Sequence, residues 1–253
     1  MAWPALALSI GMAVAAGLVG CFAVMKRMSL ASDAMSHVAL PGIGLALAFH
    51  LHPVLGGLAA LLVGTLLVWG LERQTRIATE TVIGVTFSVA LAVGSMLATG
   101  EELVDALLGA PGSLGPWELA LGLAGAAVVA AFVLAQRSRL VLALVSVDIA
   151  RTSGIRVARL ELLYLLAFAL TVALGLRYLG VLLMGSLVII PAATAKHLAR
   201  NLDGMLATSA AVAVASTVAG ELLAARLHRP TGPVIIAIAA GLFFASLLAR
   251  REA

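Results

Sequence analysis

The sequence predicts an all-α, polytopic membrane protein with eight or nine transmembrane helices. The first observation is composition: 62% of the 253 residues are hydrophobic, only 11% are charged, and the mean hydropathy is +1.13. Soluble domains are about half apolar and a quarter charged. The second is that long apolar runs alternate with short charged clusters, which is the pattern of successive membrane spans. The third is an uneven distribution of basic residues between alternate connections.

Counting about 20 apolar residues per crossing predicts nine spans in a single transmembrane domain, residues 1–253. They lie near residues 5–25, 30–50, 54–71, 80–99, 118–135, 160–178, 179–195, 204–224 and 230–249. The runs 30–71 and 160–195 are each too long for one crossing, since a helix rises 1.5 Å per residue. The first run breaks naturally at His50–Pro53 and the second around Arg177 and Gly180. Without the second break, eight spans remain.

The connections predict the orientation of the chain. With the N-terminus outside, 13 of the 16 Lys and Arg residues fall on one side of the membrane, and the other three on the opposite side. Because cytoplasmic loops are enriched in Lys and Arg, the N-terminus is expected outside and the C-terminus in the cytoplasm. On the outer side, the loop 100–118 carries Glu101, Glu102 and Asp105 with no basic residue. Its centre, "LVDALLGA", is too short to cross and predicts a short or re-entrant helix.

Several functional classes are disfavoured by the sequence. The net charge of +4 and the pI near 10 are explained by cytoplasmic loops, and no nucleic-acid-binding motif accompanies them. The single cysteine, Cys21, excludes an internal disulfide and a cysteine-rich metal cage. No H-E-x-x-H, G-x-S-x-G or P-loop motif occurs, so the chain is not expected to be a hydrolase or to hydrolyse nucleotides itself.

The stretch "SDAMSHVALPG" places two ionisable side chains inside an otherwise apolar run. Asp33 and His37 are four residues apart, so on a helix they share one face and can offer an oxygen and a nitrogen to one point. Pro41 follows four residues later and has no N–H, which leaves the His37 carbonyl without its helical donor. Gly42 and Gly44 permit close approach of a neighbouring helix. This combination favours a cation path.

Other interpretations of these polar residues remain. Asp33 can instead cap the helix or pair with Arg27 at the interface, and Asp33 with His37 can act as a proton relay in a secondary transporter. Pro191, in "IIPAATAKHL", frees the Leu187 carbonyl and is as consistent with a helix kink as with a site.

The longest predicted cytoplasmic segment runs over about 136–160. Within it, "DIARTSGIRVARLELL" predicts a helix, a turn at Gly154 and a second helix that enters the membrane. The segment can be a connector lying on the membrane surface or a docking element for a cytoplasmic partner.

Two segments carry a resemblance to a known family. "MKRMSLASDAMSHVALPGIGLA" and "GLRYLGVLLMGSLVIIPAATAKHLARN" resemble the membrane permeases of bacterial ATP-binding-cassette importers for zinc, manganese and iron(II), which have the type II importer permease fold. "ETVIGVTFSVALAVG", "DIARTSGI" and "RPTGPVIIAIAAGLF" are similar to further segments of that family in the same order. The resemblance covers roughly residues 10–248.

The resemblance implies a multi-pass permease of the bacterial plasma membrane that works as a homodimer, with the ion path between protomers. It implies two cytoplasmic ATPase subunits, an extracytoplasmic metal-binding receptor, and no permanently bound cofactor. It maps metal ligands to Asp33 and His37, and the family's coupling helix to about Ser146–Arg156, with Asp148, Arg151 and Gly154. Pro41, Gly42 and Pro191 are expected to shape the path.

Departures and alternatives accompany this resemblance. Family members often have an acidic residue in the loop before the last span, where this chain has "HRPTGP", so no function is carried to that loop. A permease of the same architecture for a metal chelate is one alternative. A proton-coupled secondary transporter that uses Asp33 and His37 is the second. A membrane scaffold without transport is the third, and it would leave these paired polar residues unexplained. The donor types suit Zn²⁺, Mn²⁺ and Fe²⁺ alike, and the lack of a thiolate disfavours Cu(I).

Overall fold

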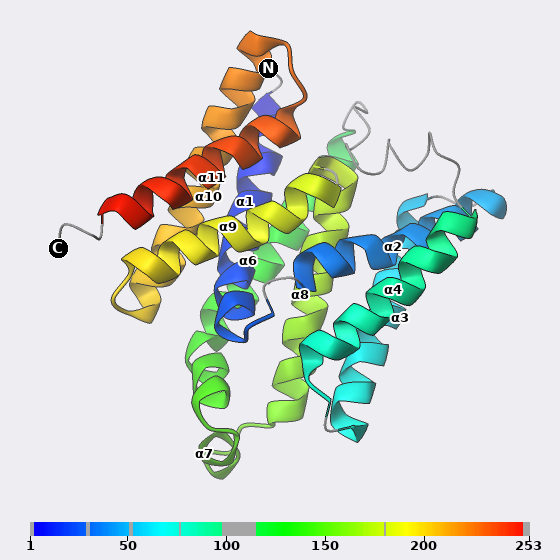
Figure 1. The fold of residues 1–253 in the computed structure, drawn as a ribbon, viewed down its shortest axis with the longest axis vertical. Coiled ribbons are helices and arrows are strands. Elements are labelled where there is room, and N and C mark those ends of the chain that lie inside the picture. The colour runs from blue at the N-terminus through cyan, green and yellow to red at the C-terminus, as the bar shows by residue number, and fades with distance from the viewer. Residues whose placement is uncertain are drawn as a thin grey trace.

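The computed structural model describes residues 3–28, 31–50, 53–75, 77–97, 115–179 and 181–249. Within these ranges all regular structure is helical, which confirms the all-α prediction. The helices in chain order (Figure 1) are α1 (Trp3–Met25), α2 (Ala31–Ala48), α3 (Pro53–Gln74), α4 (Thr79–Leu97), α6 (Pro116–Val145), α7 (Val147–Thr152), α8 (Val157–Leu179), α9 (Val181–Leu198), α10 (Leu202–Leu227) and α11 (Thr231–Ala249).

Nine helices of the described residues occupy the nine predicted spans; α7 is the tenth. Both long runs are divided: α2 ends at Ala48 before α3 begins at Pro53, and α8 ends at Leu179 before α9 begins at Val181. Among the described residues, α1, α3, α6, α8, α10 and α11 are long and apolar enough to cross a membrane. The apolar stretches of α2, α4 and α9 are shorter. The short helix predicted within 100–118 lies outside the described residues, except where α6 begins.

Helix α1 forms the centre of the bundle, in contact with α6, α8, α9 and α10. It contains no charged residue, and side chains on all its faces are buried, including Met12, Val19 and Phe22. A helix that is apolar all round is expected to lie inside a protein or a membrane. Three long-range hydrogen bonds also fix it: Tyr164 Oη donates to Val19 O (3.0 Å), Ser209 Oγ to Gly17 O (2.7 Å), and Cys21 Sγ to Met205 O (3.6 Å).

Helices α2, α3 and α4 form a second group beside this centre, on the right in Figure 1. α2 lies between its two partners, and α8 and α9 connect it with the rest of the bundle. The outward faces of α3 and α4 carry exposed apolar side chains, such as Val63, Leu67, Val85 and Val89. Apolar residues on the outside of a helix group are the surface expected to face lipid.

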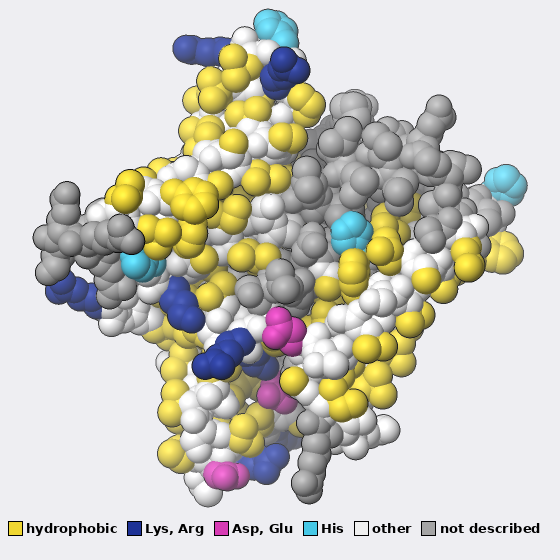
Figure 2. Space-filling model, viewed as in Figure 1, with side chains coloured by type: hydrophobic (Ala, Val, Ile, Leu, Met, Phe, Trp, Pro, Cys, Tyr) yellow, Lys and Arg dark blue, Asp and Glu magenta, His cyan; other side chains and the backbone are white. Residues whose placement is uncertain are grey.

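The two ends of the molecule differ. In Figure 1 the N-terminus lies at the top, and α7 projects at the bottom between the ends of α6 and α8. Figure 2 shows acidic and basic side chains in the lower half of this face and basic side chains at its upper tip, with hydrophobic surface along the helices between them. The predicted orientation, with the N-terminus outside, remains a prediction.

Candidate functional site

The two polar residues of the candidate site lie on α2. Ala31 begins the helix, so Asp33 and His37 both belong to its first two turns. The separation of four residues therefore corresponds to one helical turn, as the sequence predicts. The side chain of Asp33 lies outside the part of the chain that the structure describes. The meeting of its carboxylate with the imidazole thus remains a prediction.

His37 lies half-buried in the α2–α4 contact. Its imidazole packs edge-on against the Phe87 ring of α4, with the ring centroids 5.4 Å apart and an interplanar angle of 61°. The Nδ1 atom of His37 is buried and has no hydrogen-bond partner among the described residues. A buried polar nitrogen without a partner costs free energy, so such groups are rare in native structures and are explained by a functional role, a bound ion or a water molecule. An imidazole nitrogen in this state can bind a metal ion or carry a proton.

Pro41 and Gly42 bring α2 close to its neighbours. α2 continues through Pro41 to Ala48, so the proline does not end the helix but removes one backbone donor from it. Gly94 of α4 faces the proline, and a Cβ at Gly94 would lie 3.4 Å from Pro41 N and Cδ. On the other side, a Cβ at Gly42 would overlap the Gly56 carbonyl oxygen of α3. The absence of a side chain at Gly42 therefore sets the spacing between α2 and α3, whereas α4 makes an ordinary contact with Pro41 at Gly94.

Pro191 also lies within a continuous helix, α9. It is buried, and α9 contacts both α1 and α2. Against α1 the approach is closest at Gly20, where a Cβ would overlap the carbonyl oxygen of Val188. Pro191 therefore lies in the helix that joins the central helix to the candidate site. The expected role of Pro191 in shaping the path stays a prediction.

The segment 136–160 forms a bend between two long helices. α6 continues to Val145, past the expected end of the span at residue 135, because its charged residues end the apolar stretch without interrupting the helix. The short helix α7 follows, and Ser146 Oγ caps it by accepting a hydrogen bond from Ile149 N (3.3 Å). Asp148 in its first turn and Arg151 in its last turn have the signs that complement the helix dipole.

The predicted turn at Gly154 is present. Gly154 has a φ of +78°, in the left-handed region that glycine adopts at helix ends. Gly154 N donates to Arg151 O and Ile155 N to Ala150 O, each at 3.0 Å, which is the Schellman pattern. Ala150 is fully buried, while Asp148 and Arg151 are exposed. The bend therefore presents charged and apolar side chains outward from a fixed backbone.

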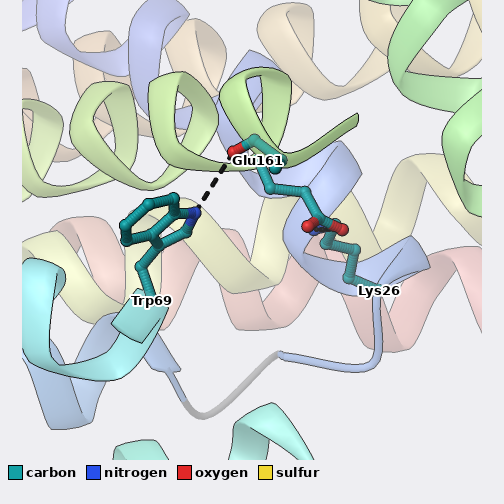
Figure 3. Close-up of polar contacts among 4 residues, drawn as sticks. Lys26, Trp69 and Glu161 are labelled. Carbon is teal, nitrogen blue, oxygen red and sulfur yellow. Dashed lines mark hydrogen bonds and ion pairs between the residues drawn. The ribbon is translucent and has the colours of Figure 1, made fainter. Parts of the chain in front are cut away.

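Sequence reasoning missed a group of contacts where α1, α3 and α8 meet (Figure 3). Lys26 Nζ lies 3.7 Å from Glu161 Oε1, and Trp69 Nε1 donates a hydrogen bond to Ala158 O at 3.1 Å. These pairs join residues far apart in the chain, so no local pattern indicates them. A signal was nevertheless present, since Glu161 is an acidic residue near the start of the predicted span 160–178.

Comparison with known proteins gives a consistent result. The family model described as the ABC 3 transport family matches residues 1–250. The high-affinity zinc uptake system membrane protein ZnuB of Haemophilus influenzae is 28% identical, covering 99% of this chain and 98% of ZnuB. The chelated iron transport system membrane protein YfeD of Yersinia pestis is 31% identical over 96% of this chain and 86% of its own.

A third relative and a solved structure extend the comparison. The manganese import system permease protein ScaB of Streptococcus gordonii is 28% identical, with 96% of this chain and 88% of ScaB covered. The structure of PsaBC from Streptococcus pneumoniae in complex with Fab superposes with a TM-score of 0.81 at 26% identity. It covers 96% of this chain and 89% of the other. The relatives are named for three different metals.

Proposed function

This chain belongs to the ABC 3 transport family, and on that premise we propose that it is the permease of an ATP-driven importer for a divalent transition-metal ion. The family membership confirms the resemblance seen in the sequence motifs, and with it a multi-pass membrane protein that is a transport subunit and not an enzyme. The identity of the ion, ATP as the energy source and the path that the ion follows are proposals.

The proposed path uses Asp33 and His37 as transient metal ligands. The observation that supports it most is the buried Nδ1 of His37, which has no hydrogen-bond partner among the described residues and lies on a helix that packs closely against α3 at Gly42 and against α4 at Pro41. In a homodimer, two carboxylates and two imidazoles would line the space between protomers. That set suits Zn²⁺, Mn²⁺ and Fe²⁺, and the two carboxylates would offset the ion's charge in a poorly hydrated path.

The proposed partners are two cytoplasmic ATPase subunits and an extracytoplasmic metal-binding receptor. The surface of α7 supports the first, because Asp148, Ile149 and Arg151 are exposed while the backbone behind them is fixed at Gly154. A helix that presents mixed apolar and charged side chains fits a groove on a partner protein. Movement of the ATPase subunits would then switch which side of the membrane the path faces.

The test is metal accumulation in cells that co-express the receptor and the ATPase, with zinc, manganese and iron measured in parallel by elemental analysis. We compare wild type with His37→Ala at matched abundance in the membrane. The matched control is His50→Asn, which replaces an exposed histidine just past the C-terminal end of α2. His50 has a φ of +54°, a conformation that asparagine tolerates.

We expect one metal to fall to background in His37→Ala and to stay at the wild-type level in His50→Asn. That metal is then the cargo. Unchanged accumulation of all three metals in His37→Ala would overturn the ligand assignment. Uptake that persists without the ATPase and follows a proton gradient would favour the secondary transporter, in which the same two residues relay a proton. Uptake only of a chelated metal would favour the chelate permease.

A further inference from the structure

Helix α8 connects the bend at α7 with the candidate site. Among the described helices, α8 is in contact with both α7 and α2. It also contacts α1, which precedes α2 in the chain, and α3, which packs against α2. In Figure 1, α8 runs upward from α7 through the middle of the molecule. A displacement of α7 can therefore be transmitted to α2 through α8.

The junction between α7 and α8 is stiff. Two backbone hydrogen bonds of 3.0 Å close the turn, from Gly154 N to Arg151 O and from Ile155 N to Ala150 O. Ile155, directly after the glycine, packs against the hydrophobic core. Since the turn is held by both hydrogen bonds and apolar contact, movement of α7 is passed to the first turns of α8 and is not absorbed by a loose loop.

The first turns of α8 are attached to two other helices by side chains (Figure 3). Trp69 of α3 reaches over and donates its indole N–H to Ala158 O, at 3.1 Å. Lys26, just past the end of α1, forms an ion pair with Glu161 at 3.7 Å. The side chains of Lys26 and Glu161 are only 17% and 30% exposed, so the pair is less screened than one on the surface. Lys26 Nζ also lies 5.5 Å from the centre of the Tyr164 ring, which restrains it further.

Both attachments lead to α2. After Lys26 the chain turns sharply, with Arg27 at a φ of +60° and Met28 N bonded to Ala23 O at 2.8 Å. α2 begins at Ala31, a few residues later. Trp69 belongs to α3, which touches α2 at the Gly42–Gly56 approach. A shift of α8 at Glu161 and Ala158 therefore acts on the start of α2 through α1 and on its middle through α3.

We propose that Glu161, Lys26 and Trp69 are positioning residues that couple movement of α7 to the metal ligands on α2. The proposal rests on the proposed function, because it assumes that α7 receives the movement and that α2 carries the site. The rival interpretation is that the three side chains only stabilise the fold. If the three residues couple α7 to α2, loss of their contacts lowers the number of ions transported per ATP while stability and ATP hydrolysis stay unchanged. If they only stabilise the fold, that number changes only when stability also falls.

The experiment uses the complete transporter, with permease, ATPase and receptor, in proteoliposomes supplied separately with zinc, manganese and iron(II). The variants are Glu161→Gln, Lys26→Gln, their double variant, and Trp69→Phe, which removes only the indole donor. The readout is the number of metal ions transported per ATP hydrolysed, with the melting temperature of the complex. Asp203→Asn is the matched control, because it breaks the Arg137–Asp203 ion pair (2.7 Å), which joins α6 to α10 and not α8 to α1.

We expect Glu161→Gln to lower the transport ratio by between about two-fold and thirty-fold, the range seen for residues that couple distant sites. ATP hydrolysis and the melting temperature should stay near wild type, and the double variant should be no worse than the worse single variant. Trp69→Phe should lower the ratio in the same direction, and Asp203→Asn should leave it unchanged.

A wild-type ratio in both Glu161→Gln and Trp69→Phe would overturn this inference and leave the proposed function in place. Equal losses of transport and ATP hydrolysis would also overturn it, since they indicate failed assembly. Additive losses in the double variant would show that Lys26 and Glu161 do not act as a pair. If the wild-type complex transports none of the three metals, the proposed function itself fails.

Discussion

Helices α1 and α2 are consecutive in the chain, but they differ in burial and in the polar residues that they carry. α1 has no charged residue and is buried inside the bundle on nearly every side. α2 carries Asp33, His37 and Pro41 within a shorter helix, and its nearest partners, α3 and α4, have largely exposed outer faces. The polar contacts also differ: α1 is fixed by three long-range hydrogen bonds, whereas Nδ1 of His37 has no partner among the described residues.

The difference between α1 and α2 indicates which helices of this fold can carry polar groups that function in transport. Buried polar groups without partners destabilise a protein, so a core helix such as α1 excludes them. α2 also contributes Val38 and Ala39 to the hydrophobic core, but its face toward α4 carries His37. The following variants test whether stability is concentrated at α1 and transport at α2.

The largest effect on stability is expected at Gly20 of α1. In Gly20→Ala the new methyl group would overlap the Val188 carbonyl oxygen, which cannot move without shifting α9. Overpacking of this kind costs about 1–3 kcal/mol. We expect a lower melting temperature of the purified protein in detergent, measured by the temperature dependence of its solubility or intrinsic fluorescence.

Two alanine variants calibrate this result. Gly84→Ala is the neutral control, because nothing lies within 4 Å of the position its methyl group would take. Gly42→Ala creates an overlap with Gly56 O on the α2–α3 side, where we expect a smaller loss of melting temperature than for Gly20→Ala but a larger loss of transport. If Gly42→Ala destabilises the protein as much as Gly20→Ala does, the contrast between the two helices is wrong.

An intermediate effect, larger on transport than on stability, is expected at Phe87. Phe87→Leu removes the edge-on contact with the His37 ring but keeps an apolar side chain. Such aromatic contacts contribute about 0.5–1.5 kcal/mol, so looser placement of the imidazole should weaken metal transport by roughly two- to twelve-fold. The initial rate of metal uptake at low concentration measures it.

Phe244→Leu serves as the comparison for Phe87→Leu. Phe244 makes a similar contact with Phe243 on α11, at 5.5 Å between centroids, and is far more exposed than a core residue. Uptake by this variant should equal that of wild type. Equal rates in wild type and Phe87→Leu would indicate that Phe87 does not position His37.

The smallest effect is expected at Tyr164, whose hydroxyl donates to Val19 O of α1. Tyr164→Phe removes this hydrogen bond while keeping the ring between Phe22 and Phe168. Hydrogen bonds between membrane helices contribute about 0.6 kcal/mol on average. We expect a small drop in melting temperature and an unchanged transport rate. A clear loss of transport at unchanged stability would place α1 in the function as well as in the scaffold.

Much of the fold follows from local sequence features. The positions of the nine helices can be predicted because an apolar helix that crosses a membrane must be about as long as the hydrocarbon layer is thick. The breaks at His50–Pro53 and after Leu179 follow from the same comparison of lengths. The turn at Gly154 follows from glycine at a helix end. The end of α6 does not follow, because Arg137 and Arg139 mark where apolar sequence stops and not where the helix does.

The site is less predictable than the fold. Asp33, His37 and Pro41 stand out because polar residues are rare in an apolar run. Phe87 does not stand out, since an aromatic residue in an apolar helix has no marker for its partner on α2. The Trp69–Ala158 hydrogen bond is equally invisible, because it depends on how α3 and α8 cross. Packing between distant segments decides these contacts, and no periodicity within one helix encodes it.

The length of α6 has a consequence for how the protein meets its surroundings. Its 30 residues extend about 45 Å, whereas the hydrocarbon layer is about 30 Å thick. The helix is therefore longer than the layer of lipid tails is thick, and its excess length would place α7 among the headgroups and water. In the proposed transporter, the length of α6 would then set the height of α7 above the bilayer, so that the proposed ATPase subunits could bind α7 without touching the membrane.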